Sequence, residues 1–158
     1  MAFLEWLEYS ALAEWVATST WGYPVLLTTH SIGLGIIVGI LFVINLRMLG
    51  AFSKISVVTL AKLFPLTRIA FALNLSSGFA LFMNQATLFA THPAFVIKIT
   101  AVIIALMNAR VIEKRIQTEG EQWDLQKPIP TNIRMLAAGS IALWLIAIIT
   151  GRLIAYVE

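Results

Sequence analysis

The sequence predicts an all-α membrane protein, a four-transmembrane-helix bundle preceded by an N-terminal amphipathic interfacial helix. The first reason is composition: 59% of the 158 residues are hydrophobic, only 12% are charged, and the mean hydropathy is +0.88. Soluble domains carry about a quarter charged residues. The second reason is that the charges cluster and leave four long apolar runs between them. A chain of this length is expected to form a single membrane domain over residues 1–158.

Residues 2–18 are expected to form the interfacial helix. Apolar side chains, including Trp6 and Trp15, recur there at roughly helical spacing, and Glu5, Glu8 and Glu14 lie between them. A helix with one apolar face, one charged face and tryptophan anchors lies along the membrane surface. Gly22 and Pro24 then interrupt this pattern where the first spanning segment is expected to begin.

Four apolar segments are each long enough to cross a hydrocarbon core about 30 Å thick. The second of them has Pro65 in its first turn, where a helix tolerates proline. The longest polar connection is expected to be a loop at 113–132. The predicted spans are 24–46, 64–86, 94–112 and 133–156.

The distribution of basic residues predicts the orientation of the bundle. One side, formed by the loops at 47–63 and 111–132 with the adjoining helix ends, holds nine basic residues: Arg47, Lys54, Lys62, Arg68, Arg110, Lys114, Arg115, Lys127 and Arg134. The other side holds only Lys98 and Arg152. Basic residues mark cytoplasmic loops, so the net charge of +3 is attributed to topology, and no nucleic-acid partner is expected. We therefore predict a bacterial inner-membrane protein with both termini in the periplasm.

Polar residues of four spans are expected in one layer near the outer face. His30 lies about 9 Å and Lys98 about 8 Å below the outer helix ends, from a rise of 1.5 Å per residue. Arg152 lies at a similar depth, and Met83 lies near the outer end of its helix. No acidic residue lies in this layer, so an anionic ligand would balance its charge. Haem b fits, with His30 on the iron and Lys98 or Arg152 paired with the propionates.

Each of these residues also has a purely structural interpretation. His30 can serve as a hydrogen-bonding group between helices, and Lys98 and Arg152 can extend towards lipid phosphates. Met83 can be a packing residue. His92 lies before Pro93 in a short connection and is either an exposed loop residue or a second metal ligand. In the functional interpretation, Met83 and His92 are the two alternatives for that second ligand.

Gly33 follows His30 by almost one helical turn, in a run of small residues (Ser31, Gly35 and Gly39). Such a run normally lets two helices approach closely. The functional alternative is that Gly33 leaves space for a flat macrocycle beside His30.

The residue types that the sequence lacks exclude several kinds of cofactor site. The chain has no cysteine and only two histidines, which excludes thioether-attached haem, iron–sulfur clusters and thiolate zinc sites and allows one bis-histidine haem at most. A His/Met pair, a His/Lys pair and a five-coordinate iron remain open. No Ser/His/Asp set, phosphate-binding loop or carboxylate pair supports hydrolase chemistry.

Three short motifs resemble a bacterial family of small four-span membrane proteins of unknown function. They are His30 followed by Leu-Arg-x-Leu-Gly at 46–50, Pro-x-Phe-x-x-Lys at 93–98 and Gly-Arg-Leu at 151–153. More distantly, the pattern is similar to the copper-resistance D family and to the haem-containing four-helix protoporphyrinogen oxidase. By that resemblance His30 would be a haem ligand and Lys98 its functional partner.

The sequence therefore favours a haem b-binding membrane protein, either an electron-transfer subunit or a small oxidoreductase, with the haem in the periplasmic half of the bundle. A quinol or a periplasmic protein would be its redox partner. One alternative is copper handling by His30, Met83 and His92, although Lys98 and Arg152 would repel a cation. The other is a non-catalytic structural subunit of a larger membrane complex, or a homo-oligomer. Whether the chain is an enzyme stays open.

Overall fold

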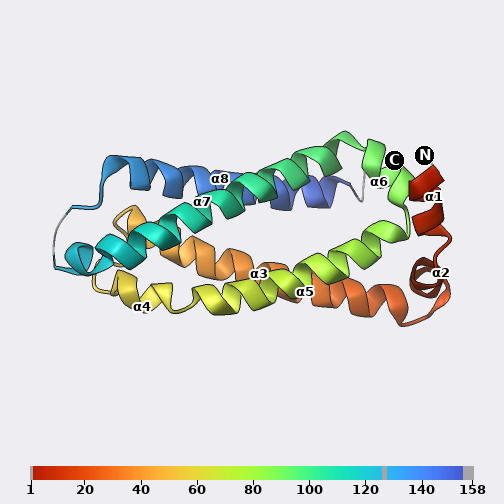
Figure 1. Ribbon diagram of the computed structural model, residues 1–158, viewed down its shortest axis with the longest axis horizontal. Coiled ribbons are helices and arrows are strands. Elements are labelled where there is room, and N and C mark those ends of the chain that lie inside the picture. The colour runs from red at the N-terminus through yellow and green to blue at the C-terminus, as the bar shows by residue number, and fades with distance from the viewer. Residues whose placement is uncertain (1, 126–127, 155–158) are drawn as a thin grey trace.

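The protein is described here by a computed structural model over residues 2–125 and 128–154. Its four long helices lie side by side along the longest axis (Figure 1). Each contains an apolar stretch long enough to cross a membrane, and the second span joins a short helix to a long one. The chain is thus an all-α, multi-pass membrane protein with four spans, as predicted. The long helices are α3 (Gly22–Met48), α5 (Phe64–Met83), α7 (Pro93–Asp124) and α8 (Thr131–Leu153).

Four short helices lie at the two ends of the bundle. Three of them, α1 (Ala2–Glu8), α2 (Ala11–Thr18) and α6 (Ala86–Thr91), lie together at what we call the N-terminal end (Figure 1). The fourth, α4 (Val57–Ala61), lies at the opposite end, which we call the basic end because most lysines and arginines of the sequence belong to it.

The expectation of one continuous interfacial helix over 2–18 is wrong in one respect, because the helix is broken in two. Ser10 has extended backbone angles (φ −71°, ψ 150°), and its Oγ accepts a hydrogen bond from the Ala13 backbone N–H at 3.3 Å. Serine is a preferred N-cap because its side chain satisfies a free N–H of the first helical turn. The break lets α1 turn away from α2 and reach α6.

The helix bounds differ most in α7, which continues twelve residues past the predicted end at 112 and takes up most of the predicted loop 113–132. At 1.5 Å per residue its 32 residues span about 48 Å, so its polar part extends beyond a hydrocarbon core of about 30 Å. An i,i+4 ion pair between Arg115 and Glu119, 2.7 Å long, supports the extension. The predicted span 64–86 ends instead at Met83 and α6 begins separately at Ala86, while residues 155–156 of the predicted span 133–156 lie outside the described residues.

The long helices pack as two pairs, α3 with α5 and α7 with α8, and α3 joins the pairs by also packing on α8. The core between them is apolar and includes Ile37, Leu41 and Trp144, each at most 2% exposed. One buried polar contact crosses it, because Asn45 Nδ2 donates a hydrogen bond to Ser140 Oγ at 3.1 Å. The outer faces are covered with exposed apolar side chains that suit contact with lipid: Val25, Ile32, Ile69, Ile103 and Ile149 are examples.

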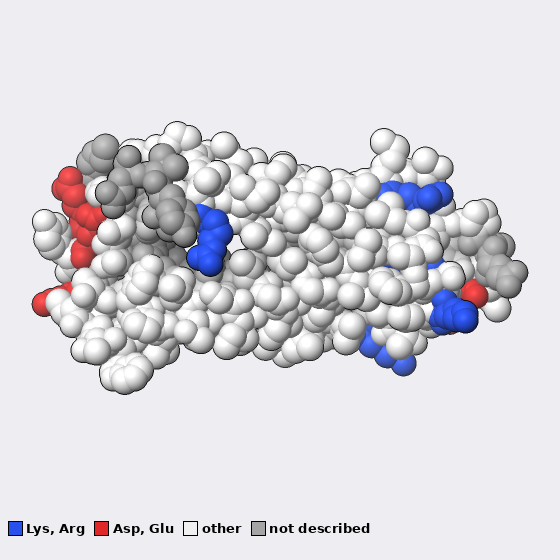
Figure 2. All heavy atoms as spheres, turned by 180° about the vertical axis from the view of Figure 1, so that it is seen from behind, with Lys and Arg blue, Asp and Glu red and all other residues white. Residues whose placement is uncertain are grey.

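Charged side chains lie mostly at the two ends of the bundle. The space-filling view shows red acidic groups at one end, basic groups towards the other, and a broad band between them that is largely white (Figure 2). One basic group on this face lies inward of the acidic end. This pattern is what a membrane-spanning bundle requires, because charged side chains are costly in hydrocarbon. The placement of the basic end in the cytoplasm stays a prediction from the positive-inside rule.

Asp124, the last residue of α7, ties three elements together at the basic end. Its carboxylate accepts hydrogen bonds from the Val57 backbone N–H at 2.8 Å and from Ser56 Oγ at 2.7 Å, at the start of α4. It also lies 3.6 Å from Arg47 of α3, whose Nε donates to the Ile55 carbonyl at 2.7 Å. The polar extension of α7 thus holds the connection between the first two spans.

A carboxylate also joins the short helices at the N-terminal end. Glu8 Oε1 accepts hydrogen bonds from the Thr87 side-chain hydroxyl at 2.7 Å and from the Thr87 backbone N–H at 2.8 Å. These two bonds, the hydroxyl first, lower the pKa of Glu8 below its usual value of 4.5. A carboxylate at the start of α6 also has a favourable orientation towards the helix dipole.

We predict that the contact between α1 and α6 depends on pH below neutrality. Because the folded-state pKa is lowered, the contact's contribution is fully present above the unfolded pKa and is lost as the pH falls through the folded value. Titrating the protein in detergent while following the Thr87 amide resonance by NMR should show a transition below pH 4.5. Glu8→Gln should lack that transition. The same transition in both proteins would assign it to another group.

Candidate functional site

A cavity of about 730 Å³ opens at the N-terminal end of the bundle, among α3, α5, α6, α7 and α8. Its volume falls in the range of about 300–1,000 Å³ typical of small-molecule sites. Its lining is largely apolar and aromatic, with a few polar groups: Tyr23, Leu27, His30, Gly78, Leu81, Phe82, Asn84, Gln85, Leu88, Phe89, His92, Phe95, Lys98, Gly151, Arg152 and Ile154.

His30 of α3 is held by hydrogen bonds to α5. Its Nδ1 lies 3.0 Å from the Asn74 backbone carbonyl oxygen, and the Asn74 side-chain amide donates to the His30 carbonyl at 2.8 Å. Nδ1 also lies 3.3 Å from the Asn74 side-chain amide nitrogen, which is a donor. The carbonyl contact is the shorter of the two, and because a carbonyl only accepts hydrogen bonds it favours the tautomer with the proton on Nδ1. Nε2 then keeps its lone pair, which is the state of a histidine that binds a metal or accepts a proton.

Gly78 gives the His30 ring its space. A Cβ atom at residue 78 would lie 2.9 Å from His30 Cε1 and 3.0 Å from Nδ1, closer than side-chain carbons normally come. Asn74 and Gly78 are four residues apart, so they lie on one face of α5. The sequence shows them in a run of small and polar residues (74–78), but only the i,i+4 spacing opposite His30 indicates their joint role.

Lys98 and Arg152 line the same cavity as His30. The end of the Lys98 side chain lies against Gly151 of α8, since a Cβ there would be 3.5 Å from Lys98 Cδ, Cε and Nζ. No acidic residue is among the described residues that line the cavity. The arrangement is therefore one imidazole and two cationic side chains in a mostly apolar chamber.

Two residues predicted for the site lie elsewhere. Met83 is only 7% exposed and packs with Leu7 of α1, Ala13 of α2 and Ala86 of α6. Gly33 does not line the cavity either. A Cβ atom on Gly33 would lie 3.0 Å from the Ala70 carbonyl oxygen, so this glycine permits close packing of α3 on α5.

His92 lines the cavity and also caps α7. Its Nδ1 accepts a hydrogen bond from the Ala94 backbone N–H at 3.2 Å. Of the two predicted second ligands, His92 thus lies at the cavity and Met83 lies away from it.

Aromatic rings form one wall of the cavity. Phe95 of α7 stacks on Phe82 of α5, with ring centroids 5.3 Å apart, and on Phe89 of α6 at 6.0 Å. Phe95 belongs to the Pro-x-Phe-x-x-Lys motif, in which only the lysine was predicted to have a site role. Stacked rings of this kind offer a flat apolar surface to a planar ligand.

Across the described parts of the chain, no three His, Cys, Asp or Glu side chains are grouped so that they could hold a metal ion. No family model matches the sequence, and comparisons with curated proteins and with solved structures also give no match.

Proposed function

We propose that the chain is a haem b-binding membrane protein that acts as an electron-transfer subunit or as a small membrane oxidoreductase. The observation that carries the proposal is the geometry of His30. It lines a large cavity, and its Nδ1 is engaged by the Asn74 carbonyl, which reserves Nε2 for a ligand. Histidines that ligate metals almost always donate their other ring N–H to a carbonyl or carboxylate.

The remaining residues of the cavity fit the group. Haem is planar and largely apolar and carries two carboxylates. The stack of Phe82, Phe89 and Phe95 suits its macrocycle, and Lys98 and Arg152 suit its propionates. His92 and Lys98 also line the cavity wall, and either would be a candidate for a second ligand of the iron, while a five-coordinate iron would need neither.

Bound haem would supply one-electron redox chemistry. The chain's own residues would fix its position and tune its potential. Asn74 orients the His30 ring, Gly78 makes room for it, and the apolar part of the wall would limit the contact of a bound macrocycle with water. Axial ligand identity, burial and nearby charge are the terms by which a protein sets a haem potential. The predicted periplasmic position of this end would let a quinol or a periplasmic protein exchange electrons with it.

The structure favours copper handling less. His30 and His92 both line the cavity, but the thioether of Met83 packs away from it, and Lys98 and Arg152 would repel a cation. A soft thioether ligand would have been the strongest reason to expect Cu(I).

The proposal predicts the absorption spectrum of the protein purified in mild detergent after expression with ample haem supply. We expect a Soret band and sharp α and β bands on reduction with dithionite. His30→Ala should lose most of the Soret absorbance, because it removes the axial nitrogen. Thr29→Ala is the matched control, since Thr29 bonds only within its own helix, to the Val25 carbonyl. Colourless wild-type protein, or a His30→Ala spectrum like that of wild type, would contradict the proposal.

A further inference from the structure

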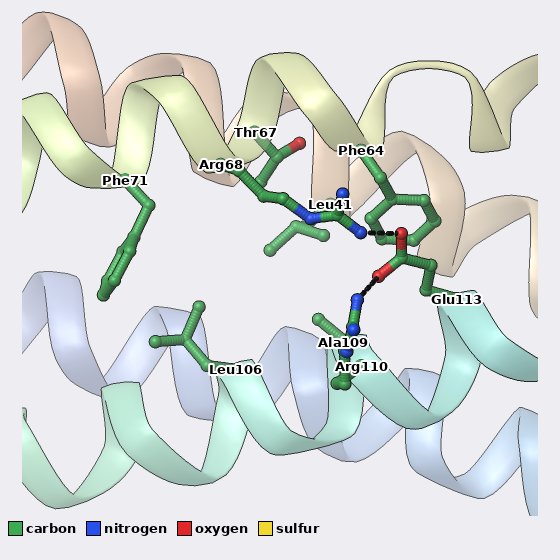
Figure 3. Close-up of a pocket in the computed structure, with 9 residues that line it drawn as sticks. All are labelled: Leu41, Phe64, Thr67, Arg68, Phe71, Leu106, Ala109, Arg110 and Glu113. Carbon is green, nitrogen blue, oxygen red and sulfur yellow. Dashed lines mark hydrogen bonds and ion pairs between the residues drawn. The ribbon is translucent and has the colours of Figure 1, made fainter.

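A second, smaller cavity of about 150 Å³ lies near the basic end, between α5 and α7. Figure 3 shows Arg68 of α5 and Arg110 of α7 converging on Glu113 from the two sides of this gap. Whereas α5 packs closely on α3 and α7 on α8, α5 and α7 make few close backbone contacts. The groove between them opens on the surface of the bundle, since the side chains of Arg68 and Arg110 at its mouth are largely exposed.

Glu113 holds the two arginines in place. Its side chain is only 7% exposed, and it accepts hydrogen bonds from Arg68 Nη2 on Oε1 and from Arg110 Nη1 on Oε2, the latter at 2.8 Å. Both carboxylate oxygens are thus engaged, and the buried acid acts as a positioning residue that spans the gap between α5 and α7.

The two guanidinium groups keep capacity for another anion. Their side chains are 57% and 73% exposed, and Glu113 is the sole acceptor that either contacts within residues 2–125 and 128–154. Each guanidinium has five N–H donors, so most donors remain free. Two positive charges on one carboxylate leave a net positive charge at the mouth of the groove.

The deeper part of the groove is apolar. Phe71 lies about one turn along α5 from Arg68, and Leu106 one turn along α7 before Arg110. Because the two helices run in opposite directions, both side chains lie on the side of the arginines that faces the middle of the bundle, as Figure 3 shows. Charge at the helix ends and hydrocarbon towards the middle match the two halves of an amphiphile in a bilayer.

We propose that this groove binds an anionic glycerophospholipid, with the headgroup phosphate on Arg68 and Arg110 and an acyl chain against Phe71 and Leu106. Arginine suits phosphate because its planar fork donates two parallel hydrogen bonds. Basic pockets between transmembrane helices are a known way to hold anionic headgroups. The inference does not rest on the haem proposal, since the two cavities share no residue.

The test is lipid binding by delipidated full-length protein in a zwitterionic detergent, measured by native mass spectrometry. The three probes are phosphatidylglycerol, phosphatidylcholine and inorganic phosphate. We expect phosphatidylglycerol to bind at one site, and the double variant Arg68→Gln/Arg110→Gln to bind it roughly thirtyfold more weakly, the factor that corresponds to about 1 kcal/mol for each of the two basic residues near anionic lipid. Arg115→Gln, which removes a basic residue paired with Glu119 away from the groove, should bind as wild type does.

Leu106→Trp tests the contribution of the acyl chain apart from that of the headgroup, because the larger side chain fills the groove and leaves both arginines in place. It should also weaken phosphatidylglycerol binding, and with the single variant Arg68→Gln it carries the test if the double variant does not fold. Equal binding of phosphatidylcholine would overturn the assignment of an anionic lipid. Inorganic phosphate that competes at the same concentration as the lipid would show that no acyl chain is held. If Arg115→Gln weakened phosphatidylglycerol binding as much as the groove variants do, the effect would come from the overall charge of the protein, and the assignment of the site would be wrong.

Discussion

Replacing Asp124 with alanine is expected to destabilise the folded protein by about 4 kcal/mol, the sum of about 1 kcal/mol for a lost helix cap and about 3 kcal/mol for a buried partner charge left unpaired. Asp124 supplies the acceptor for the Val57 and Val58 backbone N–H groups at the start of α4. It also faces Arg47, whose side chain is only 8% exposed and keeps one acceptor, the Ile55 carbonyl. Alanine would leave the guanidinium charge without a counter-ion in a site that water barely reaches.

The measurement is unfolding in mixed micelles of rising SDS fraction, followed by circular dichroism, together with amide hydrogen exchange. Exchange at Val57 and Val58 should rise first, since these amides lose their acceptor while the spans remain intact. Glu121→Ala is the matched control, because it removes an exposed acid of the same helix three residues away. If both variants unfold at the same SDS fraction, the role assigned to Asp124 is wrong.

Asp124 also shows why the bounds of α7 were not apparent from the sequence. Hydropathy reports where a segment can cross hydrocarbon, and on that measure the third span ends near residue 112. It does not report where the helix ends, because the polar residues 113–124 gain their stability from the Arg115–Glu119 pair and from the contact of Asp124 with α4. That contact joins residues more than sixty positions apart, and no local pattern predicts it.

The residues of the candidate site were predictable as far as they follow from the depth of each residue below the end of its helix. Counting residues from the helix ends put His30, Lys98 and Arg152 in one layer, and the structure places all three on one cavity. The same count put Met83 there, but depth gives no direction around the helix axis. Met83 faces α1 and α2, which were expected to lie on the membrane surface, so no contact between them and the bundle was foreseen.

Glu113 was missed for a related reason. The sequence places it in a polar loop, where a carboxylate between two basic residues is unremarkable, whereas the continued helix turns it inward between Arg68 and Arg110. Once α7 is known to be helical there, the i,i+3 spacing of Arg110 and Glu113 places them on one face. Arg68 could be added only from the way the pair α3–α5 and the pair α7–α8 come together, because it belongs to another span.

The largest effect expected at the proposed haem site, apart from loss of His30 itself, is that of Gly78→Ala. In an ordinary helix this change is favourable by roughly 0.5–1 kcal/mol, since alanine is the better helix former. At residue 78 the new methyl group would lie 2.9 Å from His30 Cε1 and 3.0 Å from Nδ1. Something must shift to relieve this contact. Because the atoms it meets belong to the His30 ring, we expect the ring to move and its 3.0 Å hydrogen bond to the Asn74 carbonyl to lengthen or break.

We therefore expect Gly78→Ala to lose most of its haem, or to show a shifted Soret band, while circular dichroism still reports a folded bundle. Gly39→Ala is the matched control, because a Cβ atom there meets nothing within 4 Å, and it should keep the wild-type spectrum and gain slightly in stability. The comparison separates site geometry from helix propensity, since both changes are the same substitution within a spanning helix. A wild-type spectrum in Gly78→Ala would mean that the position of the His30 ring against α5 does not matter for the cofactor, and the ligand would then have to be sought elsewhere on the cavity wall.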